Sequence, residues 1–421
     1  MPIIDVPGID RKAGIKCYCT SFGGVGGSIK RKANQFRVSE IIDGSVFSGL
    51  VPVQDNLHRY PLYILEKSNI DSNHAVSQIK KKFGIELKVI GLKDAKANTK
   101  QYATTEQLKN TPREIRTDGL LLDLCGFTRK PLRKALLLGN EFTIIIKDTV
   151  PLDVSIFEAE IKNIANFYGL QRFGSERSVT HLVGKEILKR NFRNAVELLL
   201  CYTSEYDSKM SREIREKCRD PHNYPSLLKH LPQGMDIEYQ LMLAIVKGKD
   251  PIFALRSIPI NMRRLFVQAY QAYIFNLCLS KAVLNEENLL KGKKGDLCFE
   301  LEGPFIFGKI RKFDPVCDSD SNAVPAIRLA GYSFQGGEGR FEMITKDTMK
   351  DECITAKNFY IKDMQELSSQ GGFRQAPLWS VDFSFVRETS LTLSFKLPKG
   401  SYATTLLREL MKPVDPISSG F

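Results

Sequence analysis

The sequence predicts an α/β protein with a mixed β-sheet and an inserted second domain. The chain has 421 residues, which is longer than a single hydrophobic core usually extends. Strand-like and helical segments alternate over residues 1–180 and again over residues 373–421, whereas residues 181–372 contain charge-rich helical segments. We therefore expect residues 1–180 and 373–421 to form one domain, with residues 181–372 as an α/β domain inserted into it.

The first elements are a pair of strands and a helix. Phe36, Val38 and Glu40 share one face of an extended segment, which predicts a strand, and a second strand is expected from Pro61. Polar residues 71–73 and Gly84 bracket a segment with helical spacing, which predicts a helix between them.

The next segment places an acidic side chain beside the sheet. Residues 86–94 are predicted to form a short buried strand that ends in a glycine turn. Asp94 is therefore expected at the mouth of the sheet, a position that suits chemistry.

The remaining elements follow the same alternation. Residues 140–148 predict a strand and residues 154–167 an amphipathic helix. Residues 391–400 predict another strand, and residues 401–412 a helix capped by Ser401. The last two elements are expected to join the sheet of the first domain.

Charge and cysteine content indicate the partner and the compartment. There are 61 Lys and Arg against 48 Asp and Glu, and the net charge of +13 favours a polyanion such as nucleic acid. The nine cysteines include no CxxC pair, which favours a reduced chain. No segment reads as a signal peptide or a membrane span, so we expect a cytoplasmic protein.

Two polar segments have the composition of a site. Residues 91–101 combine charged groups with small alanines directly after an apolar strand. Residues 166–174 set aromatic rings beside an amide and an arginine, as a pocket that stacks on a base requires. A solvated turn with Asp94 as a helix cap would explain the first segment, and an ordinary aromatic core would explain the second.

Four segments together resemble the TruD family of tRNA pseudouridine synthases. GLKDAKANTKQ (91–101) is similar to the family's GxKDxxAxTxQ signature, and NFYGLQRFG (166–174) to its NYFGxQRFG. Residues 27–30 followed by QFRVSEI resemble its GxxK and DFxVxE segment, and LPKGSYATTLLREL (397–410) resembles its LPxGSxATxxxREL. The resemblance implies a pseudouridine synthase catalytic domain with a TruD-type insertion.

The resemblance also implies an activity and residue roles. The expected reaction is isomerisation of a uridine in tRNA, with uridine-13 as the expected target. Asp94 matches the aspartate on which the reaction depends, and Lys30 the active-site lysine near it. Tyr168 falls where the family usually has the Phe that packs on the target base, and Asn166 matches the neighbouring pocket Asn. Phe167 and Tyr168 are swapped relative to the family's usual Tyr then Phe.

The chemistry explains why a carboxylate is needed. The reaction breaks the bond between N1 and C1′ and joins C5 to C1′, so a carboxylate beside the sugar serves as nucleophile or base. A nearby cation such as Lys30 would favour its ionised form. Attack at C1′ and removal of the 2′ proton both stay open.

Further contacts with RNA or with the pocket are expected from the same two segments. They are Lys93, Thr99, Gln101, Gln171, Arg172 and Phe173. The reaction requires neither a cofactor nor a metal, and the five histidines show no metal-ligand spacing.

Two other functions compete with this interpretation. The first is an RNA-binding protein or RNA chaperone of the same fold without catalysis, whose binding would survive loss of Asp94. The second is another RNA-modifying enzyme such as a methyltransferase, which would need a glycine-rich cofactor turn that the sequence does not show.

Overall fold

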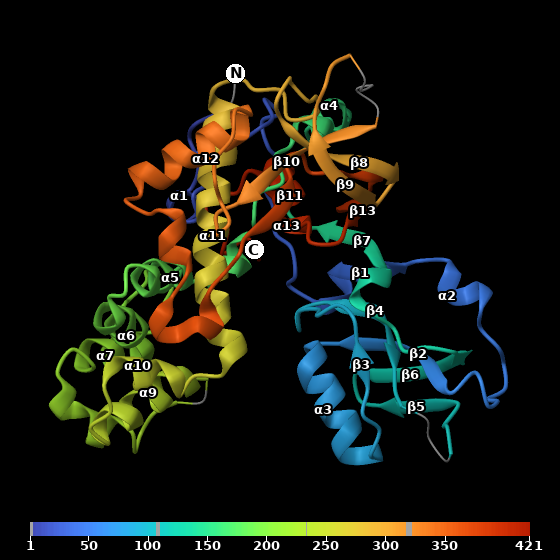
Figure 1. Ribbon diagram of the computed structural model, residues 1–421. Coiled ribbons are helices and arrows are strands. Elements are labelled where there is room, and N and C mark those ends of the chain that lie inside the picture. The colour runs from blue at the N-terminus through green and yellow to red at the C-terminus, as the bar shows by residue number, and fades with distance from the viewer. Residues whose placement is uncertain (1–2, 107–109, 233, 317–321) are drawn as a thin grey trace.

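A mixed nine-stranded sheet lies on the right in Figure 1, which shows the computed structural model. The structure describes residues 3–106, 110–232, 234–316 and 322–421. The strand order is β12-β13-β7-β1-β4-β2-β6-β5, with β3 pairing to β4. The strands are β1 (Phe36–Ile42), β2 (Tyr60–Ser68), β3 (Lys88–Val89), β4 (Asn98–Thr104), β5 (Glu114–Thr117), β6 (Leu120–Thr128), β7 (Leu137–Ile146), β12 (Val381–Arg387) and β13 (Leu391–Pro398). Among these strands β1 and β4 pair in parallel and the other pairs are antiparallel. The predicted mixed α/β fold is confirmed.

Three helices cover this sheet. α13 (Ala403–Met411) and α4 (Val154–Glu160) bury Leu406, Leu407 and Phe157 against apolar side chains of β7 and β13. α3 (Ser72–Phe83) packs on β2 and β6 through Ala75 and Ile79. Since β12 and β13 lie in the same sheet as β1 to β7, the two ends of the chain share one core.

A helical region and a smaller sheet lie between β7 and β12 in the chain. The four-stranded sheet has the order β11-β10-β8-β9. Its strands are β8 (Leu297–Gly303), β9 (Ile306–Lys312), β10 (Ala323–Leu329) and β11 (Gly372–Gln375). The helices are α5 (Thr180–Leu188), α6 (Phe192–Cys201), α7 (Lys209–Lys217), α8 (Tyr224–Leu227), α9 (Asp236–Val246), α10 (Pro251–Arg256), α11 (Ile260–Leu284) and α12 (Arg340–Asp351). The division at 181 and 372 stays a prediction.

The N-terminal segment is tied to both parts of the molecule. α1 (Gly8–Lys12) lies beside α11, where the side-chain amide of Asn276 donates to the carbonyl of Ala13 at 2.9 Å. Arg408 of α13 forms a buried ion pair with Asp10 at 2.6 Å. The remaining short elements are α2 (Ser45–Ser48) and the 3-10 turns Ala33–Gln35, Lys134–Leu136, Ile161–Asn163, Leu170–Phe173, Pro221–Asn223, Ala356–Phe359 and Lys362–Leu367.

Of the two helices expected within residues 1–180, the structure contains the first as predicted and shortens the second. The helix after Asp71 is confirmed, because the Asp71 carboxylate accepts from two backbone N–H groups and Gly84 ends the helix at φ +69°. The helix expected over 154–167 is too long: α4 ends at Glu160, and Ala165 pairs with Pro377.

Ser401 is not the cap of the last helix. α13 has Tyr402 at its N-cap with no side-chain cap hydrogen bond, and the Ser401 hydroxyl has no partner among the described residues. The strand expected over 86–94 shortens to Lys88–Val89.

Apart from Cys298, the described residues include seven free cysteines, and Cys317 lies outside them. No helix among the described residues is both long enough and apolar enough to cross a membrane.

Candidate active site

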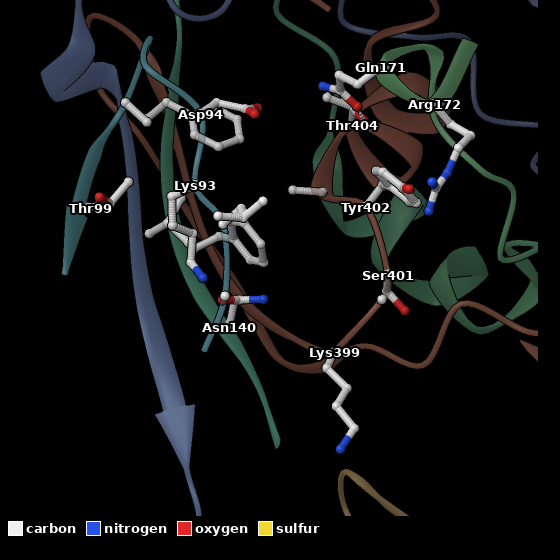
Figure 2. Close-up of a pocket in the computed structure, with 18 of the residues that line it drawn as sticks. Lys93, Asp94, Thr99, Asn140, Gln171, Arg172, Lys399, Ser401, Tyr402 and Thr404 are labelled. Carbon is white, nitrogen blue, oxygen red and sulfur yellow. Dashed lines mark hydrogen bonds between the residues drawn. The ribbon is translucent and has the colours of Figure 1, made fainter. Parts of the chain in front are cut away.

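A cavity of 470 Å³ lies between the large sheet and an aromatic wall, which is formed by Tyr168 and Tyr402 with Phe275 packed against Tyr168. The sheet side is formed by β1, β4, β7 and the loop between β3 and β4, and it carries Lys93, Asp94, Thr99 and Asn140 (Figure 2). The facing side carries Gln171, Arg172, Tyr402 and Thr404, with Ser401 and Lys399 along its lower edge (Figure 2). The cavity therefore joins segments that are more than 200 residues apart in the chain.

Asp94 lies exposed on the loop between β3 and β4 and lines the cavity. Hydrogen bonds hold the backbone of this loop. The Lys93 N–H donates to the Ser72 hydroxyl at 2.9 Å, and the buried Gln101 amide donates to the carbonyl of Gly91 at 3.2 Å. The loop is fixed while the Asp94 carboxylate stays open to a ligand.

Lys30 reaches the cavity from a strained turn. Its φ of +57° lies in the left-handed region, which is uncommon for a residue with a Cβ. Its ammonium lies 4.7 Å from the centre of the Phe36 ring. Burial lowers the pKa of Lys30, and the negative charge of Asp94 acts in the opposite direction. No ion pair joins the two side chains in the part of the chain that the structure describes.

Tyr168 is the centre of the aromatic wall. Its ring meets the rings of Phe275 and Tyr402 edge-on, with centroids 5.4 and 6.0 Å away. The guanidinium of Arg374 lies 4.1 Å from the Tyr168 centroid, within cation–π range. Arg374 is held in turn by Asn166, whose carbonyl and side-chain oxygens accept at 3.1 and 2.8 Å. Tyr168 thus presents a rigid ring to the cavity.

Four polar atoms of the cavity-lining residues are buried and lack a protein partner within the described residues. They are Thr99 Oγ1, Asn140 Oδ1, Arg172 Nε and Ser401 Oγ. Buried polar groups are normally hydrogen-bonded, so a cluster of unpaired ones calls for an explanation. A polar ligand in this cavity would supply partners if these side chains turned toward it.

The family comparison matches almost the whole chain. The model described as tRNA pseudouridine synthase D (TruD) matches residues 12–410. The chain belongs to the tRNA pseudouridine synthase D family. This family is one of isomerases of the pseudouridine synthase class, and the resemblance drawn from the four sequence segments is confirmed.

Curated relatives and a solved structure agree with TruD membership. A relative from Archaeoglobus fulgidus, named "Probable tRNA pseudouridine synthase D", is 30% identical, and the match covers 96% of this chain and 99% of that one. One of the same name from Methanococcoides burtonii is 28% identical, with 98% and 99% covered. A crystal structure described as TruD from Methanosarcina mazei superposes with a TM-score of 0.78 at 27% identity, covering 98% of this chain and 99% of that one.

The TruD segments supply most of the cavity lining, but several of their predicted residues are held by other parts of the protein. Lys93 lines the cavity, but its ammonium is paired with Glu40 in a buried ion pair of 2.6 Å. Gln101 is fully buried and binds the loop backbone. Phe173 is also fully buried and packs edge-on against His181, so as placed it offers no surface to RNA. Asn166 is buried behind Tyr168 and supports Arg374 rather than lining the cavity.

The other predicted residues line the cavity. Asp94, Lys30, Tyr168, Thr99, Gln171 and Arg172 all do so. Their roles in the reaction stay predictions.

Several residues of the site were missed in the sequence. Glu40 and Lys67 hold the Asp94 loop, while Arg374 and Tyr402 complete the aromatic wall. A signal existed for Tyr402, which lies inside the C-terminal TruD segment. No comparable signal marks Arg374, whose place depends on β11.

Metal ligands are the last feature of the site. Across residues 3–106, 110–232, 234–316 and 322–421, no group of three or more His, Cys, Asp or Glu is placed to hold a metal ion.

Proposed function

We propose that this protein isomerises a uridine of tRNA to pseudouridine, with uridine-13 as the target and Asp94 as the catalytic carboxylate. The observation that carries the proposal is that the Asp94 carboxylate and the Tyr168 ring line one cavity of 470 Å³. Membership of the TruD family supports the substrate class.

The arrangement suits a nucleotide taken out of its stack. The uracil would lie against Tyr168, because stacking on an aromatic ring offsets the loss of base stacking in the RNA. The ribose would then face Asp94, which either attacks C1′ or removes the 2′ proton. The negative charge of Asp94 raises the pKa of Lys30, so this cation interacts with the carboxylate. Thr99, Asn140 and Ser401 line the cavity, and if their unpaired side-chain atoms turned toward it they would offer hydrogen bonds that retain the detached uracil.

A basic surface leads away from the cavity and would bind the RNA backbone. Lys399 lines the cavity and its ammonium lies 3.4 Å from the carbonyl of Ala135. Next to Ala135, the exposed side chains of Lys130, Arg133 and Lys134 form no ion pair among the described residues. Unpaired cations beside the cavity favour phosphates, and binding there would release counterions.

The cytoplasm is the proposed compartment. Apart from Cys298, seven free cysteines in the described part of the chain fit a reducing environment.

The test is the Asp94→Asn variant. Formation of pseudouridine in tRNA should be abolished, while tRNA affinity stays within a few fold because many cations share the binding. Asp347→Asn, the same change at an exposed residue of α12, is the matched control and should keep full activity. Substantial turnover by Asp94→Asn would refute Asp94 as the catalytic carboxylate. A wild-type protein that binds tRNA but never forms pseudouridine would instead support the non-catalytic RNA chaperone.

A further inference from the structure

Lys67 is a buried lysine whose ammonium binds only backbone carbonyls among the described residues. It lies on β2 in phase with the fully buried Tyr63 and Leu65, and it is 3% exposed. Its Nζ donates to the carbonyl of Ile70 at 2.7 Å, of Asp94 at 2.9 Å and of Lys93 at 3.3 Å. An ammonium has three N–H donors, so all three are used.

Two of these carbonyls belong to the loop that carries Asp94. The third, Ile70, precedes α3, whose Ser72 also binds the loop through the Lys93 N–H and carbonyl. The Ser72 hydroxyl donates to Gln101 Oε1 at 2.9 Å and completes the connection to β4. The Asp94 backbone is therefore clamped from β2 and α3, although its carboxylate is exposed.

We propose that Lys67 is a positioning residue for the isomerisation, because its ammonium fixes the backbone of Asp94 and hence the place of the carboxylate in the cavity. The inference rests on the proposed role of Asp94. Displacement of a reacting group by about 1 Å can cost on the order of 100-fold in rate, so a loosened loop should lower the chemical step.

Lys67 also gives the clamp a dependence on pH. Burial lowers its pKa to about 8, while Asp71 and Asp94 raise it and Lys93 lowers it. A neutral amine keeps two N–H donors for three carbonyls, so the clamp weakens as pH rises through this range. The free energy of unfolding changes in the opposite direction. Between about pH 8 and pH 10.5 Lys67 is protonated in the unfolded chain but largely neutral in the folded protein, so stability rises with pH over this range. Activity and melting temperature should therefore diverge.

The experiment compares Lys67→Met with Lys88→Met. Lys88 is an exposed lysine of β3 paired with Glu106, so its variant loses the same charge outside the loop contacts. We expect Lys67→Met to lower the single-turnover rate at saturating tRNA by roughly 10- to 100-fold. The dissociation constant for tRNA and the rate of Lys88→Met should stay near wild type. A Lys67→Met protein that is folded by its melting curve and turns over at the wild-type rate overturns the proposal.

Two further variants keep the test decisive. If Lys67→Met does not fold, Ser72→Ala removes only a hydroxyl of the same clamp and should lower the rate by several fold without changing affinity; an unchanged rate counts against the clamp. Lys67→Arg keeps its charge at high pH, so its activity should persist where the wild type declines above about pH 8. If Lys67→Arg loses activity over the same pH range, Lys67 is refuted as the titrating group. The decline would then be assigned to Lys30, because burial lowers the pKa of that lysine as well.

Asp94→Asn measured alongside separates the two proposals. An inactive Asp94→Asn with a fully active Lys67→Met rejects Lys67 alone, whereas an active Asp94→Asn rejects both.

Discussion

Replacement of Tyr168 tests the aromatic wall of the cavity. Stacking of a base on an aromatic ring contributes roughly 1 to 3 kcal/mol, which corresponds to a factor of about 5 to 150 in kcat/KM. The ring also receives the Arg374 guanidinium at 4.1 Å, an interaction of about 0.5 to 2 kcal/mol. Tyr168→Phe keeps both contributions and should retain most activity. Tyr168→Leu loses both and should lower kcat/KM by one to two orders of magnitude.

The assay separates a role in the site from a role in packing. Tyr168 lines the cavity but also packs against two hydrophobic clusters, so Leu will lower stability as well. We would measure the melting temperature and the single-turnover rate of the folded fraction for both variants. Unfolding without a specific loss of rate would remove Tyr168 from the site. A large loss in Tyr168→Phe would show instead that the hydroxyl, rather than the ring, is required.

The Asp94 loop, the basic surface and the metal dependence of the reaction can each be tested. Gly91→Ala should lose roughly 1 to 3 kcal/mol of unfolding free energy, measured by denaturant titration, because its Cβ would lie 2.5 Å from Glu40 Oε1; a neutral effect would contradict the close approach. Arg133→Ala with Lys134→Ala should weaken tRNA binding and reduce the slope of log K against log salt by about 1 to 2, whereas Lys346→Ala with Lys350→Ala on α12 should leave the slope unchanged. Activity should persist after exhaustive chelation and dialysis, since the reaction exchanges bonds within one nucleotide; recovery only on adding a metal, with the tRNA still folded, would contradict this.

Local signals in the sequence were sufficient for much of the fold. Alternation predicted β1, and the Asp71 cap with Gly84 predicted α3, because those patterns act within a few residues. The end of α4 was missed because tertiary pairing decides it: Ala165 bridges Pro377, more than 200 residues away. Ser401 had the right type for a cap, but its backbone lies one residue before the N-cap.

The site was predictable where a segment acts as a unit. Residues 91–101 and 166–174 supply Asp94 and Tyr168 to the same cavity. Which side chains of a segment face the cavity depends on contacts that the segment does not contain. The Lys93 ammonium is paired with the Glu40 carboxylate of β1. The Phe173 ring packs into a core that includes Ala269 and Ala272 of α11. Polarity in a motif therefore predicted the location of the site better than the role of each residue.

Two buried charges on the strands that flank β4 explain how an exposed carboxylate can be held in place. Glu40 of β1 and Lys67 of β2 flank β4, and each satisfies its charge with the loop that follows β3. β3 has only two residues and gives this loop little support of its own. Moving the loop would leave Lys67 with only the Ile70 carbonyl and Glu40 with only the Tyr102 N–H, and a buried charge that loses its main partners costs up to about 3 to 5 kcal/mol. The cost opposes displacement of the backbone while the Asp94 side chain remains in solvent. A lysine or glutamate in the apolar phase of a predicted strand is therefore a sequence signal for a partner loop, and here both signals lead to the loop that carries Asp94.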